Sequence, residues 1–132
     1  MKLAIFGGSF NPVHYGHLLL AENARWNFKL DKIIFMPAGR PPHKPDAPLA
    51  GDDHRLKMIK LAIEGNPAFE AGNYELNKHG LSFTYDTLKY FSAKIKKGKD
   101  ELFFIMGIDL LLQIHTWKKS EGLLDLCTFI VG

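Results

Sequence analysis

Four short, almost continuously apolar runs punctuate the chain. They cover residues 2–6, 32–37, 101–107 and 127–131, and each ends at or beside a glycine or a proline. Runs of this length and composition are typical of strands that are buried on both faces of a sheet. The pattern therefore predicts four strands, and residues 69–77 form a weaker candidate for a fifth.

The segments between the apolar runs have the periodicity of helices. Residues 15–28 space their apolar side chains for a helix rather than for a strand. A second helix begins at Asp52 or Asp53, either of which can cap it, and Gly65 follows its end. The remaining helical segments are a helix after residues 80–86 with Leu88, Phe91 and Ile95 on one face, and short pieces at 109–114 and 120–126.

Alternation of strands and helices indicates the fold class. Short buried strands separated by helices predict an α/β protein with a doubly wound, mostly parallel sheet and helices on both faces. We expect one domain over residues 1–132. Ligands of such sheets bind beyond the carboxyl ends of the strands, close to the point where the strand order reverses. Residues 7–17, 38–44 and 107–117 follow predicted strands and are the first candidates for a site.

Composition narrows the classes of partner. The net charge is +3, which suits a phosphate-bearing ligand but is too small an excess to indicate nucleic acid. Cys127 is the one cysteine, so an internal disulfide is impossible and a reducing compartment is expected. No apolar stretch is long enough to span a membrane, and the N-terminal apolar run is too short for a signal peptide. We expect a cytoplasmic protein without a membrane partner, and composition leaves open whether it forms a homo-oligomer.

The stretch GGSFNPVHYGH, residues 7–17, joins the first strand to the first helix. Gly7 and Gly8 allow the backbone to approach a ligand closely. His14 and His17 are three residues apart, which places both on one face where the helix begins. Unpaired N–H groups and the positive helix dipole favour phosphate there, and Gly16 leaves space for it. The two imidazoles can donate hydrogen bonds to phosphate oxygens and stabilise charge in a transition state.

Two other interpretations of this stretch are open on the residues alone. A histidine pair can bind zinc, although no third ligand follows at helical spacing and the HExxH pattern is absent. A glycine-rich turn with two surface histidines and no ligand is the simplest interpretation. The stretch contains neither the GxxxxGK[ST] phosphate loop nor the GxGxxG dinucleotide motif.

Taken together, residues 7–17 resemble the G-x-F-[DN]-P-x-H-x-G-H signature of the HxGH nucleotidyltransferases, which have a Rossmann-like fold. The later segments FMPAGRPPHK (35–44), HRLKMIKLAI (54–63), SFTYDTL (82–88) and FIMGIDLLLQIHTWKK (104–119) are similar, in order, to bacterial nicotinate-mononucleotide adenylyltransferases. The resemblance covers essentially the whole chain. It implies adenylyl transfer from ATP to nicotinate mononucleotide in NAD biosynthesis, with Mg²⁺ accompanying ATP.

The resemblance also implies roles for individual residues. His14 and His17 would be catalytic and would contact the ATP phosphates. Asp109 would bind a ribose hydroxyl or help to hold magnesium, and an aspartate within an apolar run needs a partner. Arg55 and Asp86 are interpreted as structural. The other residues that would line the ATP and phosphate site are Gly7, Gly8, Ser9, Phe10, Gly16, His43, Lys44 and Gly107.

The acceptor would bind at residues from two later segments. Thr84 and Tyr85 would hold the nicotinate carboxylate at a helix start, as suits an anion. Trp117 would stack on the pyridine ring. The sequence leaves open whether the acid or the amide mononucleotide is preferred.

The chain departs from the family pattern in three places. Asn11 replaces a common aspartate, and Ile108 stands where a small residue is usual. The ISSTxIR-like motif, which grips the ATP phosphates in relatives, does not occur, so we expect a C-terminally truncated chain. The alternatives are a non-catalytic fragment that binds mononucleotide, and another HxGH enzyme such as a pantetheine-phosphate adenylyltransferase or a cytidylyltransferase.

Overall fold

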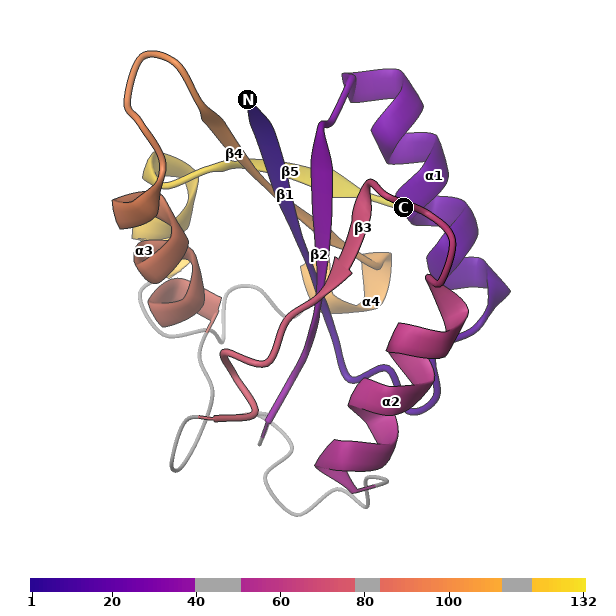
Figure 1. The fold of residues 1–132 in the computed structure, drawn as a ribbon. Helices are drawn as coiled ribbons and strands as arrows, with labels where there is room; N and C mark the ends of the chain where they lie inside the picture. The colour runs from indigo at the N-terminus through magenta and orange to yellow at the C-terminus, as the bar shows by residue number, and fades with distance from the viewer. Residues whose placement is uncertain (40–50, 78–83, 113–119) are drawn as a thin grey trace.

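A computed structural model describes residues 1–39, 51–77, 84–112 and 120–132. Within these ranges, five strands alternate with helices along the chain (Figure 1). The elements are β1 (Lys2–Gly8), α1 (Tyr15–Phe28), β2 (Lys32–Pro37), α2 (Asp52–Ala62), β3 (Phe69–Ala71), α3 (Thr84–Lys94), β4 (Glu101–Met106), α4 (Ile108–Leu111), the 3₁₀ helix η2 (Ser120–Asp125) and β5 (Thr128–Val131).

The strands form one parallel sheet in the order β3-β2-β1-β4-β5. The chain winds from β1 outwards to β3 and then returns to the other side of β1, so the order reverses between β1 and β4. Ile5 pairs with Ile34 on one side and with Phe104 on the other, so the carboxyl ends of the three central strands lie at the same edge. The predicted doubly wound α/β fold is confirmed.

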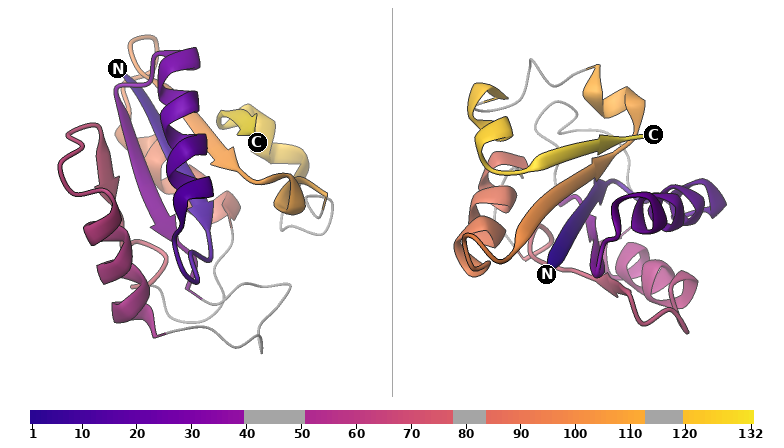
Figure 2. Two further views of the ribbon diagram at one scale, coloured as in Figure 1. Left: turned by 90° about the vertical axis from the view of Figure 1, so that its right-hand side faces the viewer. Right: turned by 90° about the horizontal axis from the view of Figure 1, so that it is seen from above.

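Helices cover both faces of the sheet (Figure 2). α1 and α2 lie on one face, and α3 and η2 lie on the other. A hydrophobic core lies on each face of the sheet. Successive side chains of a strand point to opposite faces, so alternate residues pack into different cores. Ala4 and Phe6 of β1 pack under α1 and α2, whereas Leu3 and Ile5 pack under α3.

Four elements differ from the sequence prediction. α3, which was expected after residue 86, begins at Thr84. β1 continues through Gly7 and Gly8, which pair with β2 in register. The weak strand candidate is strand only over Phe69–Ala71. The predicted aspartate cap of α2 is wrong: Gly51 is the N-cap without a side-chain bond, and the Asp52 carboxylate bonds Arg55 instead.

Gly7 has a steric reason to be a glycine. A Cβ built on it would lie 2.5 Å from Cζ of the buried Phe104 ring. We expect Gly7→Ala to lower the free energy of unfolding by about 1–3 kcal/mol, since the buried Phe104 ring must shift to make room for the methyl group. Gly51→Ala is the control for added volume, because nothing lies within 4 Å of its Cβ position, and as a change of helix N-cap it should cost at most about 1 kcal/mol. Urea unfolding measures both, and equal effects would contradict the steric argument.

Candidate functional site

The connection from β1 to α1 turns sharply beside the point where the strand order reverses. Phe10 has a φ of 49°, and its ring is buried against Phe6 with centroids 5.3 Å apart. This buried ring anchors the loop to the sheet, while Ser9 and Asn11 on either side of it are exposed. The loop therefore presents polar groups at the carboxyl edge of β1, where ligands of this fold class bind.

His14 and His17 cap the N-terminus of α1. His14 is the N-cap, and its Nδ1 accepts a hydrogen bond from the Gly16 N–H at 3.0 Å. His17 Nδ1 accepts from the His14 N–H, also at 3.0 Å, which completes a capping box. The two rings stack with centroids 3.9 Å apart. The prediction that both histidines share one face at the helix start is confirmed.

Two details of the sequence prediction need correction here. The N–H groups of Gly16 and His17 were expected to be unpaired, yet they donate to Nδ1 and to the carbonyl oxygen of His14. Gly16 was expected to leave space for a ligand, yet the His14 ring occupies that space. A Cβ on Gly16 would lie 2.8 Å from His14 Cε1. With these two N–H groups paired, the imidazoles are additional donors that this helix end can offer to a ligand.

His17 is the more enclosed of the two histidines. Its ring meets Phe10 edge-on at 4.8 Å and Phe6 at 5.9 Å between centroids. Burial, and secondly the neighbouring His14, lower the pKa of His17 from 6.5 to about 4. The His17 ring is therefore neutral at physiological pH.

This pKa makes stability depend on pH. Between pH 6.5 and about 4 the unfolded chain binds a proton at His17 that the folded chain does not bind, so folding weakens as the pH falls through that window. We expect the stability advantage of the wild type over His17→Asn to shrink between pH 7 and pH 5. Urea unfolding at both pH values measures it, and a difference that does not change with pH would contradict the lowered pKa.

Arg55 connects this loop to the next strand end. Its side chain is fully buried, and one terminal nitrogen donates to the carbonyl oxygens of Ser9 at 2.9 Å and Ala38 at 2.7 Å. The other terminal nitrogen donates to Asp52 at 2.7 Å. Arg55 thus holds the loops after β1 and β2 against the start of α2, which agrees with its structural interpretation. Sequence reasoning missed these partners; the signal was an arginine four residues before the buried Ile59, on the core face of the helix.

The other predicted phosphate-site residues lie after β4. Gly107 is the N-cap of α4, and its Cβ position is open. Asp109 is exposed in the first turn of α4. Burial therefore gives no reason to expect a partner for Asp109, because β4 ends at Met106 and the Asp109 side chain is exposed on α4. β4 pairs directly with β1, so these residues follow the strand end beside the glycine-rich loop.

The predicted acceptor residues are only partly described. Thr84 and Tyr85 form the first turn of α3, and Tyr85 packs against the core under that helix. α3 runs back along parallel strands, so its first turn lies at the same edge of the sheet as the histidine loop (Figure 1). His43, Lys44 and Trp117 lie outside the described residues.

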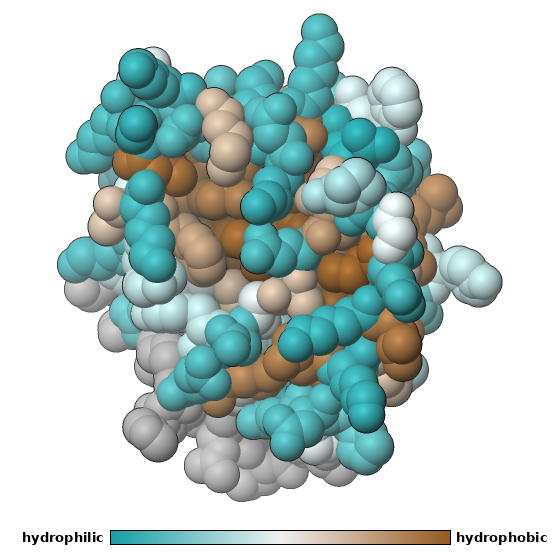
Figure 3. All heavy atoms as spheres, in the orientation of Figure 1, coloured by the Kyte–Doolittle hydropathy of each residue, from teal (hydrophilic) through white to brown (hydrophobic). Residues whose placement is uncertain are grey.

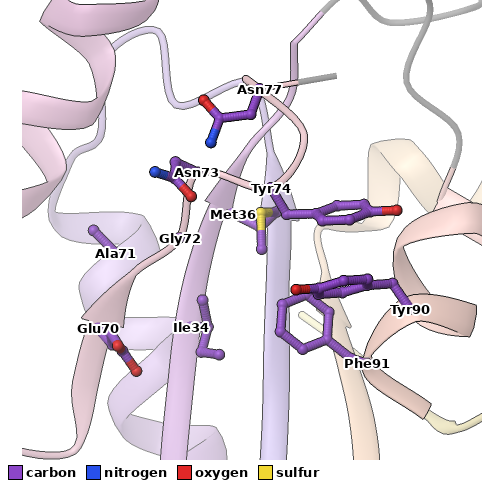
Figure 4. A pocket seen from close by; sticks show the side chains of 10 residues that line it. All are labelled: Ile34, Met36, Glu70, Ala71, Gly72, Asn73, Tyr74, Asn77, Tyr90 and Phe91. Carbon is purple, nitrogen blue, oxygen red and sulfur yellow. The ribbon is translucent and has the colours of Figure 1, made fainter. Parts of the chain in front are cut away.

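A pocket of about 420 Å³ opens between the β2–β3 side of the sheet and α3 (Figure 4). Ile34 and Met36 form its floor, and Tyr74 and Tyr90, stacked at 4.1 Å, stand on one side of it. In Figure 3, apolar side chains show between hydrophilic ones in the middle of this face. Neither histidine lines the pocket. It is a hollow beside the short strand β3, separate from the histidine loop.

Metal ligands and membrane segments can be assessed over the described ranges. There, no three His, Cys, Asp or Glu side chains gather closely enough to hold a metal ion. No described helix has both the length and the apolar character needed to cross a bilayer.

Comparison with known proteins agrees with the fold and the motif. Residues 5–132 match the family model described as cytidylyltransferase-like. A probable nicotinate-nucleotide adenylyltransferase of Thermoanaerobacter sp. (strain X514) is 47% identical over 132 residues, which are 100% of this chain and 62% of the relative. One from Moorella thermoacetica is 46% identical, over 99% of this chain and 60% of the relative. The chain thus spans about 60% of the length of these curated relatives.

Solved structures show the same fold. A putative nicotinate-nucleotide adenylyltransferase from Vibrio parahaemolyticus superposes with a TM-score of 0.79 at 20% identity, covering 98% of this chain and 72% of that one. The nicotinic acid mononucleotide adenylyltransferase of Plasmodium falciparum, complexed with NaAD, gives a TM-score of 0.75 at 26% identity, over 98% and 63% of the two chains. The family model matches nearly the whole chain, and the parallel sheet with paired histidines beside its reversal of strand order agrees with that match. The chain belongs to the cytidylyltransferase-like family of nucleotidyltransferases.

Proposed function

We propose that this chain catalyses adenylyl transfer from ATP to nicotinate mononucleotide, giving nicotinate adenine dinucleotide and pyrophosphate in NAD biosynthesis. The observation that carries the proposal is the stacked pair His14 and His17 at the start of α1, beside the reversal of strand order. The names of the curated relatives support the choice of acceptor.

The reaction is a direct displacement at phosphorus. A 5′-phosphate oxygen of the mononucleotide forms a bond to the α-phosphorus of ATP. The bond from that phosphorus to the bridging oxygen breaks, and its electron pair leaves with pyrophosphate. No protein nucleophile is needed, so the chain contributes positioning and stabilisation of charge on the phosphate oxygens.

The residues around the β1 loop supply that positioning. His14 and His17 donate to the triphosphate, and Gly8 and Ser9 let the backbone approach it beside the buried Phe10. Gly7 supports this loop from the buried side, because its Cβ position faces the Phe104 ring. Arg55 keeps this loop in place through the Ser9 carbonyl oxygen. The proposed contributions of Gly16, His43, Lys44 and Gly107 to the phosphate site rest on the family resemblance.

Magnesium fits the site as an ion that arrives with ATP. Asp109 is an exposed carboxylate after the strand that neighbours β1. Mg²⁺ usually keeps several waters and takes one or two carboxylates together with substrate phosphates, so a single carboxylate suits it. When bound, the ion would neutralise charge on the phosphates.

The acceptor is proposed to bind at the start of α3. Helix N-termini favour anions, which suits the nicotinate carboxylate at Thr84 and Tyr85. Trp117 is proposed to stack on the pyridine ring.

The test combines turnover with binding. The 132-residue chain is incubated with ATP, Mg²⁺ and nicotinate mononucleotide, and pyrophosphate release is followed. Nicotinamide mononucleotide and pantetheine phosphate serve as alternative acceptors. We expect release with the nicotinate compound above the others. Titration calorimetry that finds mononucleotide binding without release would instead show a binding fragment, and preference for pantetheine phosphate would contradict the proposed acceptor.

A further inference from the structure

Both imidazole rings at the start of α1 accept a backbone hydrogen bond at the same ring atom. The Gly16 N–H donates to Nδ1 of His14, and the His14 N–H donates to Nδ1 of His17, each at 3.0 Å. A ring nitrogen that accepts an N–H bond carries a lone pair and no proton. The proton of each neutral ring must therefore lie on Nε2.

The surroundings hold the rings in this orientation. Turning either ring over would place a C–H group against the backbone N–H and lose the hydrogen bond. The His14 ring lies over Gly16, where a Cβ would be 2.8 Å from its Cε1. The His17 ring lies between His14 and the edge of Phe10.

We propose that the α1 cap fixes His14 and His17 as neutral Nε2–H tautomers, so that the site offers phosphate two directed, uncharged N–H donors and neither a cation nor a general acid. The proposal deepens, and for its catalytic part rests on, the proposed adenylyl transfer. The backbone N–H groups of His14 and Gly16 donate to the two Nδ1 atoms, and each ring in turn presents its Nε2–H as a donor. These donors sit further out, where they can reach the oxygens of a bound triphosphate.

Electrostatics favours the neutral pair. Two protonated rings with centroids 3.9 Å apart would repel each other. The elements packed on His17 are β1 and its following loop, which present the apolar rings Phe6 and Phe10. Burial lowers the pKa of His17, and a proton on the neighbouring His14 would lower it further.

The chemistry does not need a proton from either ring. The leaving pyrophosphate takes the electron pair of the broken bond, and Mg²⁺ and N–H donors can neutralise that charge. The pH profile of turnover should therefore show no ionisation of His17 near its ordinary pKa of 6.5.

The decisive measurement is the ¹⁵N spectrum of histidine side chains in the 132-residue chain at pH 7. We expect both residues, assigned with single variants, to show an unprotonated Nδ1 and a protonated Nε2. A protonated Nδ1, or averaging between tautomers, in either ring would overturn the proposal. The spectrum requires no turnover, so an inactive wild type would contradict the proposed function and leave the tautomer result standing.

Two variants of His14 distinguish its role as the helix cap, at Nδ1, from its role as a hydrogen-bond donor, at Nε2. His14→Asn keeps an oxygen acceptor near the position of Nδ1 and loses the outer N–H, so we expect a melting temperature near that of the wild type and a loss of turnover of about 100-fold. His14→Gln carries an amide N–H near the position of Nε2 and loses the cap, so we expect a lower melting temperature and a smaller loss of turnover. The opposite ranking of the two variants in both measurements would overturn the proposal.

Discussion

His17→Ala is expected to lower the turnover number of adenylyl transfer by about 100-fold while the KM for nicotinate mononucleotide stays within about twofold of the wild type. The substitution removes an N–H donor that is proposed to bind the triphosphate, whereas the acceptor is proposed to bind at the start of α3. Charge develops on the phosphate oxygens in the transition state, so loss of the donor affects kcat more than binding of the mononucleotide.

Steady-state kinetics with varied mononucleotide at saturating ATP measures this split. Tyr15→Ala is the matched control, because Tyr15 is an exposed neighbour of the pair on the same helix. We expect the control to keep both constants. A similar loss in kcat and in mononucleotide affinity for His17→Ala would contradict the role assigned to the ring.

Arg55→Met is expected to lower the free energy of unfolding by about 3 kcal/mol. The guanidinium is fully buried, and its loss leaves the partly buried carbonyl oxygens of Ser9 and Ala38 without their donor. Arg55→Lys keeps the charge but cannot match the forked geometry that reaches two loops and Asp52 at once, so we expect a smaller loss.

Asp52→Asn serves as the control for the ion pair alone. The Asp52 side chain is 56% exposed, so its pairing with Arg55 should contribute less than about 1 kcal/mol. Urea unfolding of the three variants gives the ranking. If Asp52→Asn proved as destabilising as Arg55→Met, the ion pair and not the two carbonyl bonds would hold the loops.

The sequence predicted the framework because the relevant signals are local. Short apolar runs that alternate with amphipathic segments indicate buried strands between helices, and a helical connection between consecutive strands favours a parallel sheet. The glycines after residue 6 and the proline at 37 marked the strand ends to within about two residues. Residues 69–77 were less well predicted, since only Phe69, Glu70 and Ala71 find a partner strand.

The sequence also located the candidate site. His14 and His17 are three residues apart on a helix, so their shared face follows from helical geometry alone. The alternation of elements placed the loop at the carboxyl end of the first strand, and the strand order of the structure places that end beside the reversal. The family resemblance then supplied the chemistry that spacing and composition left open.

Only the tertiary structure decided how that site is held together. The partners of Arg55 lie 46 and 17 residues away along the chain, at Ser9 and Ala38, and no periodicity encodes such pairs. The exposure of Asp109 likewise depends on where β4 leaves the core. The bonds from the Gly16 and His14 N–H groups to the two Nδ1 atoms depend on ring orientations that sequence spacing does not specify. Patterns along the chain determine which face a residue occupies, whereas hydrogen-bond partners are determined by positions that exist only once the elements have packed.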